Sequence, residues 1–387
     1  MSRLAILASH PIQYYGPLYR ELAGRIDLEV LFAHRATPAE QARAGYGVAF
    51  DWDIDITAGY PHRFLTNVSK TPGADRFSGC DTPEIGARLD EGDFSALLVH
   101  GWGLKSSLQG ILAAKRRGLP VLVRGDSHLD TPRSLLKRTV KAATFPALLR
   151  VFDAALYVGQ RSRAYYEHYH FPPHRLFFSP HCVDTAWFKA RATDGARRRL
   201  RSRLGVSDAT KLVLFAGRLV AYKRPNDLIM AAAFCRREGL DVEVLIAGDG
   251  ALRMPLSAAA ETVGVPLHLL GFCNQTDMPA AYAAADCLAL PSDGHETWGL
   301  VVNEAIACGR PALVSEACGC ADDLARDDAA VRSFPAGDVP RLVTAIASLF
   351  SRPPRSEVIA ALSDAYSLAT AAEGIITALD ECGWRNP

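Results

Sequence analysis

The sequence predicts an α/β protein made of two doubly wound domains, each with a parallel sheet that helices cover on both faces. The first observation behind this prediction is the length, because 387 residues correspond to two or three domains of ~100–200 residues each. The second is that short apolar runs alternate with longer amphipathic stretches. The third is that this alternation occurs twice along the chain, with one break near residues 185–205.

Apolar runs of strand length carry this prediction. Those of the first half are Leu4–Ala8, Leu28–Phe32, Ala96–Val99, Pro120–Val123 and Ala154–Val158. Those of the second half are Leu212–Ala216, Val242–Ala247, Leu267–Leu270, Cys287–Leu290 and Pro311–Val314. Helical patterns lie between them, at Ser106–Arg117, Pro225–Glu238, Met278–Ala285 and Val301–Cys308. Continuously apolar runs of this kind are typical of parallel strands that are buried on both faces.

A basic stretch separates the two halves. Residues 197–205 form an arginine-rich predicted helix that Gly205 closes, and a new strand begins at Leu212. We therefore predict domains at 1–190 and 191–366, and a last segment, 367–387, that folds back as a helix onto the first domain. Ligands of open α/β sheets lie beyond the carboxyl ends of the strands, so the cleft between the domains is the expected site.

Composition excludes several classes of protein. The 43 Lys+Arg and 42 Asp+Glu give a net charge of +1, which argues against a general nucleic-acid binder. No run approaches the ~18 apolar residues of a membrane-spanning helix. The first residues resemble a buried strand more than a signal peptide, so we expect a cytoplasmic protein. The nine cysteines include no C-x-x-C pair, and we predict no metal site.

The strongest chemical signal lies at residues 291–319. A strand that ends at Leu290 enters a glycine-containing loop, which opens a helix at about Leu300. The free N–H groups and the positive dipole end of that helix are suited to an anion. Glu296 lies in the loop and Glu304 follows eight residues later. Because carboxylates would repel a diphosphate, these two are better suited to accept hydrogen bonds from hydroxyls.

Two more strand ends add cations and glycines. Arg218 and Lys223 follow the strand that ends at Gly217, and they flank a loop before the next helix. A planar guanidinium and a point charge together suit a diphosphate. Gly248 and Gly250 follow the next strand, where they permit close approach of the backbone.

These stretches, taken in order, resemble the family 4 glycosyltransferases of the GT-B fold, with two Rossmann-like domains. The likeness is most specific over residues 211–325 and weaker across the rest of the chain. Residues 9–17 resemble a subgroup found among bacterial surface-polysaccharide transferases. Residues 177–184 resemble the family's segment before the crossing between domains, which usually carries Asn-Gly where this chain has His181 and Cys182.

The resemblance implies a nucleotide-sugar donor bound in the second domain, with no cofactor and no metal. Arg218 and Lys223 would hold the diphosphate. Glu304 would bind the ribose hydroxyls, and Glu296 would contact the sugar. The implied donor-binding set is Gly217, Arg218, Lys223, Gly248, Gly250, Gly299, Leu300 and Glu304. The family retains the anomeric configuration, and its cations would stabilise the charge that grows on the leaving diphosphate.

The resemblance also implies that the first domain supplies acceptor and sugar contacts. In the family a histidine commonly follows the strand that here ends at Val123, whereas this chain has Asp126 in that place and His128 two residues later. These two, with His100 after the preceding strand, join Glu296, Arg218 and Lys223 as catalytic candidates. The loop after the first strand adds acceptor or cleft candidates, which are His10, Gln13, Tyr14 and Gly16.

The middle of the chain is strongly basic. Residues 131–205 hold 15 Lys+Arg and 4 Asp+Glu. Within 133–150, apolar and basic residues alternate at helical spacing. This pattern fits a helix that lies on an anionic membrane, which would suit a lipid-linked acceptor, and it fits a solvated helix face equally well.

Two other functions compete with glycosyl transfer. One is a GT-B nucleotide-sugar epimerase, which the pairing of Glu296 with Glu304 disfavours. The other is a catalytically inactive nucleotide-sugar-binding protein, which is disfavoured because the predicted donor-binding set is complete. Hydrolysis of the donor in the absence of an acceptor would separate these functions.

Overall fold

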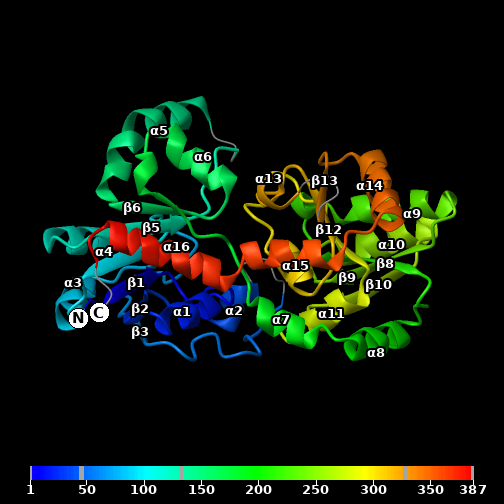
Figure 1. The fold of residues 1–387 in the computed structure, drawn as a ribbon, viewed down its shortest axis with the longest axis horizontal. Coiled ribbons are helices and arrows are strands. Elements are labelled where there is room, and N and C mark those ends of the chain that lie inside the picture. Colours follow the sequence, from blue (N-terminus) through cyan, green and yellow to red (C-terminus); the bar gives the residue numbers. More distant parts are fainter. Residues whose placement is uncertain (1, 43–47, 131–133, 326–329, 385–387) are drawn as a thin grey trace. The chain divides into compact units, whose positions relative to one another are not determined.

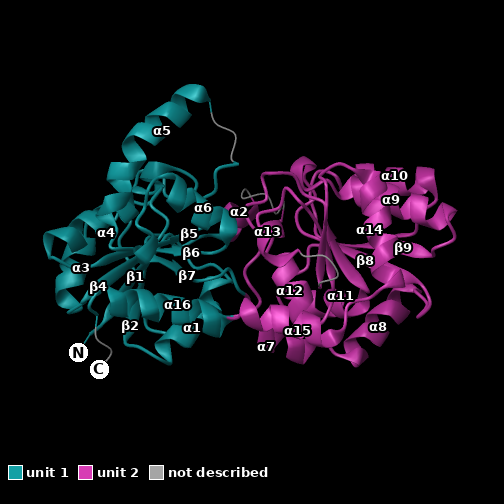
Figure 2. Cartoon of the chain, turned by 45° about the horizontal axis from the view of Figure 1, so that its top comes forward, with its two compact units in different colours: residues 1–37, 55–182, 368–387 teal, residues 38–54, 183–367 magenta. Residues whose placement is uncertain are grey.

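The computed structural model describes residues 2–42, 48–130, 134–325 and 330–384, and the chain divides into two compact units (Figure 1, Figure 2). Unit 1 comprises residues 1–37, 55–182 and 368–387, and unit 2 comprises residues 38–54 and 183–367. Each unit is built on one parallel sheet with helices packed on it, which confirms the predicted fold class.

Within its described residues, unit 1 contains a seven-stranded sheet of order β3-β2-β1-β4-β5-β6-β7, so the direction of strand addition reverses between β1 and β4. The strands are β1 (Leu4–Ala8), β2 (Leu28–Phe32), β3 (His62–Phe64), β4 (Ala96–His100), β5 (Val121–Gly125), β6 (Ala154–Tyr157) and β7 (Leu176–Phe178). The α-helices are α1 (Tyr15–Ala23), α3 (Ile85–Glu91), α4 (Lys105–Arg116), α5 (Leu135–Leu148), α6 (Gln160–His168) and α16 (Leu368–Glu381).

Strand β1 shows why the central strands are continuously apolar. Its side chains alternate between the two faces of the sheet. Leu4 and Ile6 belong to the core cluster that α1 and α16 complete, whereas Ala5 and Leu7 belong to the cluster with α3 and α4. All five residues of β1 are buried, because each face is covered by helices.

The described part of unit 2 contains a six-stranded sheet of order β10-β9-β8-β11-β12-β13, with the same reversal between β8 and β11. The strands are β8 (Lys211–Ala216), β9 (Val242–Ala247), β10 (Leu267–Gly271), β11 (Cys287–Leu290), β12 (Ala312–Ser315) and β13 (Val331–Phe334). The α-helices are α2 (Pro38–Gln41), α7 (Thr185–Arg191), α8 (Asp194–Leu204), α9 (Pro225–Arg237), α10 (Arg253–Val263), α11 (Met278–Ala284), α12 (Val301–Ala307), α13 (Ala321–Leu324), α14 (Val339–Ser351) and α15 (Ser356–Ala365). The sequence pattern did not predict β3, β7 or β13.

The chain passes from unit 1 to unit 2 between Cys182 and Val183, whereas the sequence suggested a boundary at 190/191. The difference is helix α7, which packs on α11 and α12. Phe188 of α7 is buried, with its ring centroid 6.2 Å from that of Tyr282 in α11. The start of unit 2 is therefore set by this apolar contact.

A short segment of the first half, residues 38–54, also belongs to unit 2. Its residues 43–47 lie outside the described part of the chain. Phe50 packs against Phe272 with a centroid separation of 4.4 Å. Asp53 accepts a hydrogen bond from the Thr276 backbone N–H at 3.1 Å, and Asn274 donates to the Asp51 carbonyl at 2.8 Å. These contacts fix the segment to the loop between β10 and α11.

All nine cysteines are free thiols, and seven of them are buried. Burial raises the pKa of the Cys235 thiol to about 11, and likewise that of Cys273. These thiols are therefore protonated at neutral pH. None of the helices in the described part of the chain is long and apolar enough to cross a lipid bilayer.

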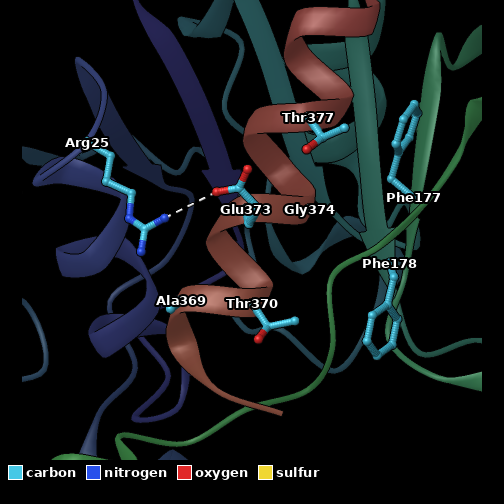
Figure 3. Close-up of a pocket in the computed structure, with 8 residues that line it drawn as sticks. All are labelled: Arg25, Phe177, Phe178, Ala369, Thr370, Glu373, Gly374 and Thr377. Atoms are coloured by element: carbon cyan, nitrogen blue, oxygen red, sulfur yellow. Dashed lines mark hydrogen bonds and ion pairs between the residues drawn. The ribbon is translucent and has the colours of Figure 1, made fainter. Parts of the chain in front are cut away.

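Helix α16 packs closely on the edge strand β7 (Figure 3). A Cβ atom at Gly374 would lie 1.8 Å from the Phe178 carbonyl oxygen, so only glycine allows this approach. Ser179 donates to the Ala371 carbonyl at 2.9 Å, and Arg25 pairs with Glu373 at 3.4 Å. A hollow of about 530 Å³ beside this contact is lined by Arg25, Phe177, Phe178, Ala369, Thr370, Glu373, Gly374 and Thr377.

The packing of α16 predicts whether Gly374→Ala raises or lowers the stability of the protein. Alanine has a higher helix propensity than glycine, so Gly374→Ala in a loosely packed helix would stabilise the protein. Here the added methyl group meets backbone, and we expect a destabilisation of about 1–3 kcal/mol in chemical denaturation. Thr377→Ala in the next turn is the control and should change stability little. An increase in stability for Gly374→Ala would show that α16 does not pack as described.

Candidate functional site

The loop between β11 and α12 brings Glu296 beside Lys223. Lys223 ends a short 3-10 turn, η5 (Ala221–Lys223), after β8, and only 7% of the residue is exposed. Its Nζ donates to Glu296 Oε2, and Ser292 Oγ donates to the same oxygen at 3.2 Å. A buried ammonium group requires such a partner. Two residues singled out on separate loops thus form one ion pair at the carboxyl edge of the unit 2 sheet.

The backbone of this loop is held by the turn after β12. The Gly319 N–H donates to the Glu296 carbonyl at 2.9 Å, and the Cys320 N–H donates to the Trp298 carbonyl at 3.1 Å. A Cβ at Gly319 would lie 1.8 Å from the Thr297 carbonyl oxygen. The position of Glu296 therefore depends on backbone contact between two loops.

The glycines at the ends of β8 and β9 serve a similar contact. A Cβ at Gly248 would lie 1.9 Å from the Gly217 carbonyl oxygen, and one at Gly250 would lie 2.7 Å from that of Leu219. The Leu219 N–H donates to the Asp249 carbonyl at 2.8 Å. The sequence predicted that these glycines allow the backbone to come close to another group. In the structure, that group is the backbone of the neighbouring loop, so the loops after β8 and β9 pack directly on each other.

The other cations of the β8–α9 loop have partners within the loop or in the first turn of α9. Arg218 donates to the Tyr222 hydroxyl at 2.7 Å. Arg224, which has a positive φ of 49°, pairs with Asp227 at 2.7 Å. The Tyr222 carbonyl accepts from the Asp293 N–H at 2.8 Å, which ties this loop to the one that carries Glu296. Arg218 and Lys223 therefore lie on one loop whose backbone is fixed to the neighbouring one.

Glu304 lies in the first turn of α12 and is 3% exposed. Its Oε2 accepts a hydrogen bond from the hydroxyl of Tyr282, a fully buried residue of α11. Gly299, with a φ of 101°, and Leu300 lead directly into the helix. The Tyr282 contact fixes the carboxylate of Glu304, and sequence spacing alone did not indicate this partner.

In unit 1 the acceptor candidates lie in the loop between β1 and α1, except Gly16, which is in α1. His10 Nδ1 lies 3.0 Å from Ser9 Oγ, and Gln13 is 8% exposed. Tyr14 directly precedes α1. A Cβ at Gly16 would lie 2.5 Å from the Ile56 carbonyl oxygen, so packing within unit 1 explains this glycine.

A buried polar cluster lies at the carboxyl ends of β4 and β5. The His100 ring lies 4.3 Å from the Tyr15 ring, centroid to centroid. Arg124 is 1% exposed, and it donates to Ser179 Oγ at 3.0 Å and to the Pro180 carbonyl at 2.7 Å. Burial, reinforced by the positive charge of Arg124, holds the pKa of His100 well below its usual range. His100 is therefore neutral at pH 7.

Asp126 and His128 have different surroundings. Asp126 Oδ2 lies 3.9 Å from Nε2 of His181, which is 7% exposed. Burial lowers the pKa of His181, and Asp126 opposes this shift only in part. His128 is also buried, and its Nδ1 lies 3.5 Å from Asp130 Oδ2. The structure thus joins Asp126, but not His128, to the cluster with Arg124.

Sequence reasoning missed Arg124, although a signal was present. A single arginine at the end of the otherwise apolar run Val121–Gly125 is a charge that must be buried and hydrogen-bonded. His181 was noted only as a departure from the resemblance. Its proximity to Asp126 arises because both lie at the carboxyl edge of the same sheet, after β7 and β5.

Comparisons with known proteins show the family to which the chain belongs. A family model described as "Glycosyl transferases group 1" matches residues 196–362. A D-inositol 3-phosphate glycosyltransferase of Mycolicibacterium gilvum (strain PYR-GCK) is 30% identical over 97% of this chain and 88% of its own length. The chain belongs to the group 1 glycosyl transferases. The resemblance to family 4 glycosyltransferases of the GT-B fold is thereby confirmed.

Other similarities of this group 1 glycosyl transferase are more partial or more distant. A GDP-mannose-dependent alpha-(1-6)-phosphatidylinositol dimannoside mannosyltransferase of Mycobacterium tuberculosis (strain ATCC 25177 / H37Ra) is 33% identical, but the match spans only 41% of each protein. The crystal structure of Anabaena Alr3699/HepE in complex with UDP superposes with a TM-score of 0.73 at 17% identity, covering 98% of this chain and all of that one. The superposition on the Anabaena structure shows a shared fold.

The Lys223–Glu296 pair makes a stability prediction. Lys223→Met leaves the carboxylate of Glu296, whose side chain is 14% exposed, without its cation, and we expect it to cost roughly 3 kcal/mol of unfolding free energy. The double variant Lys223→Met/Glu296→Gln should recover more than half of that loss. Arg163→Met, which breaks the exposed pair with Glu167, should cost less than about 1 kcal/mol in the same urea titration. Equal losses for Lys223→Met and Arg163→Met would contradict the buried pair.

The His100 ring makes a pH prediction. Neither ring nitrogen has a hydrogen-bond partner among the described residues, and both are inaccessible. Because the pKa of His100 is lower in the folded state, the unfolded state binds more protons below about pH 6.5, and stability falls with falling pH. His100→Phe should remove up to about 2 kcal/mol of the stability difference between pH 7.5 and pH 5, measured by denaturant titration. An unchanged pH slope in His100→Phe would count against a neutral buried ring.

Proposed function

We propose that this group 1 glycosyl transferase moves a sugar from a nucleotide-diphosphate sugar to an acceptor, a glycan or lipid-linked saccharide of cell-surface polysaccharide synthesis. The observation that carries the proposal is the Lys223–Glu296 pair at the carboxyl edge of the unit 2 sheet, within the residues that the family model matches. The names of the relatives support a donor of this class: one is described as GDP-mannose-dependent, and the Anabaena structure is a complex with UDP.

The chemistry of Lys223 explains how it serves both a carboxylate and a diphosphate. An ammonium group has three N–H donors, and Glu296 accepts from Nζ while the remaining donors can reach phosphate oxygens. Arg218 adds a planar fork from the same loop. Glu296 then turns its other oxygen to a sugar hydroxyl, and Glu304, fixed by Tyr282, accepts from the ribose. Gly217, Gly248 and Gly250 keep side chains away from this edge, and Gly299 and Leu300 offer backbone amides.

We propose a retaining reaction. The bond between the anomeric carbon and the diphosphate oxygen breaks through an oxocarbenium-like transition state. The acceptor oxygen forms a bond with the same carbon on the same face, and its proton passes to the leaving phosphate. Arg218 and Lys223 stabilise the negative charge that grows on that phosphate, so no metal ion is required.

Unit 1 would supply the acceptor contacts in this proposal. His10, Gln13, Tyr14 and Gly16 surround the end of β1. Asp126 and the neutral imidazole of His181 offer an acceptor next to a potential donor, which matches the hydrogen-bonding pattern of saccharide hydroxyls. A lipid-linked acceptor would bring the enzyme to the inner face of the membrane, as a cytoplasmic protein in peripheral contact through 133–150. Residue 133 lies outside the described part of the chain.

The test begins with a thermal-shift screen against nucleotide-diphosphate sugars. The true donor should raise the unfolding temperature, because a ligand at 100 times its Kd stabilises the fold by about 2.7 kcal/mol. With that donor, Lys223→Ala and Glu296→Ala should each lower turnover by roughly 100-fold, since each removes a contact to the developing charge or the sugar. Turnover is measured with and without acceptor, with EDTA, and by NMR of the product anomer.

Arg237→Ala, an exposed cation at the end of α9, is the control and should leave turnover unchanged. Wild-type rates for both Lys223→Ala and Glu296→Ala would refute the site. An epimerised nucleotide sugar without acceptor would favour the epimerase, and donor binding without any turnover would favour an inactive binding protein. Inhibition by EDTA or an inverted anomer would overturn the metal-independent, retaining reaction.

A further inference from the structure

Helix α5 carries large apolar side chains on its exposed surface. None of its residues is buried, and Leu135, Leu136 and Val140 are 79%, 74% and 53% exposed. Figure 2 shows α5 projecting from the rest of unit 1. A helix that merely faces water normally has the opposite arrangement, with apolar residues inward and polar residues outward.

The inward face of α5 is defined by its contacts. Lys141 donates to the Tyr165 hydroxyl at 3.1 Å, and its Nζ lies 4.1 Å from the centre of the Phe145 ring. Phe145 in turn packs against Trp102, with ring centroids 5.4 Å apart. Lys141 and Phe145 are four residues apart, so they lie on one face of the helix and hold that face against unit 1.

The opposite face is a continuous apolar stripe. Leu136, Val140, Ala143 and Ala147 follow one another at intervals of four, three and four residues, which places them on one side of the helix. All four are exposed. Their helical phase is roughly opposite to that of Lys141 and Phe145, so they point away from unit 1.

Positive charge accompanies this stripe. Residues 134–150 contain four Lys+Arg and no Asp or Glu. Lys137 and Arg138 are exposed near the start of the helix, respectively about a quarter turn from the stripe and on the side away from it, and neither has an ion-pair partner among the described residues. A helix with an exposed apolar stripe, long basic side chains on its other sides and no acidic residue complements an anionic lipid surface, because aliphatic side chains enter the acyl boundary and the cations reach the headgroups.

We infer that α5 is an interfacial membrane-binding helix, which inserts Leu136 and Val140 into a bilayer containing anionic lipid while Lys137 and Arg138 contact its headgroups. A second copy of the chain could also cover an apolar stripe, but that would place two segments side by side that each carry four Lys+Arg and no acidic residue. The inference goes beyond sugar transfer, since binding to lipid needs no turnover. It rests on the proposed function only in that a lipid-linked acceptor would be met at this surface.

The test uses the full chain and co-sedimentation with vesicles. Wild-type protein should pellet with vesicles of phosphatidylcholine containing about one-third phosphatidylglycerol, and it should bind pure phosphatidylcholine far less. Leu136→Ser/Val140→Ser should weaken binding to the anionic vesicles at least about tenfold, because both substitutions remove apolar area from the inserted face. Lys137→Gln/Arg138→Gln should weaken binding at low salt and flatten its salt dependence.

The matched control is Leu108→Ser/Leu112→Ser on α4, where the two leucines are 45% and 44% exposed but lie outside α5. It should bind as wild type does. The inference is overturned if wild-type protein fails to bind anionic vesicles at low salt, if the α5 serine variant binds as tightly as wild type, or if analytical ultracentrifugation shows a wild-type dimer that this variant abolishes. Donor hydrolysis without vesicles is measured in parallel, so that loss of the proposed activity is told apart from loss of lipid binding.

Discussion

The geometry of unit 2 depends on backbone-to-backbone contact between the loops at the carboxyl edge of its sheet. Gly248 touches the loop after β8, and Gly319 touches the loop after β11, at separations that leave no room for a Cβ atom. Those two loops carry Lys223 and Glu296. Two flexible side chains could contact each other in many geometries, but here backbone contacts fix the two loops that carry them. The ion pair is therefore a consequence of main-chain packing, and a larger residue at either glycine would move one charge relative to the other.

The basic residues of segment 131–205 have two different structural roles. In α8, Arg197 donates to the carbonyls of Ala283, Ala284 and Ala285, which are the unsatisfied groups at the carboxyl end of α11. Arg201, 2% exposed, donates to the Ala284 carbonyl as well. These cations are internal caps that neutralise the negative end of a helix dipole. In α5, Lys137 and Arg138 stay at the surface of a helix that also exposes apolar side chains. A net charge summed over the segment hides this division, because it does not distinguish buried from exposed cations.

Much of the fold followed from the sequence because most strands are buried on both faces and so form unbroken apolar runs. The three missed strands, β3, β7 and β13, lie at the edges of their sheets. Strand β3 (His62–Phe64) is partly exposed and begins with two polar residues, and β13 has arginine and serine at its centre. An edge strand pairs through its backbone on one side only, so its side chains need not be apolar. Composition cannot detect strands such as β3 and β13, whereas pairing with a neighbour defines them. Strand β7 (Leu176–Phe178) is apolar but has only three residues.

The sequence also predicted which candidate site residues lie near the carboxyl edge of each sheet, because that position depends on where the buried strands end. Residues that follow a strand reach the carboxyl edge of the sheet, and this predicted the places of Glu296, Lys223 and Asp126. Glu304, in α12, was singled out by its spacing from Glu296 and by the resemblance. The partners of these residues were not predictable, because Lys223 and Glu296, or Asp126 and His181, lie far apart in the chain and meet only through the order of the strands. The same holds for residues 48–54, whose place in unit 2 depends on contacts with residues 272–276 and not on their own pattern.

Arg124 shows how a buried charge can hold separate segments of backbone together. It donates to Ser179 and to the Pro180 carbonyl, and Ser179 donates onward to the Ala371 carbonyl of α16. The chain leaves unit 1 just after Pro180 and re-enters it just before Ala371. One guanidinium at the end of β5 thus ties together two of the four points at which the chain crosses the boundary of unit 1. An apolar residue in its place would fill the space but leave Ser179 Oγ and the Pro180 carbonyl without this donor, because only a donor can satisfy buried acceptors. The burial of a charge in an otherwise apolar sheet is therefore explained by the two chain crossings that it fixes.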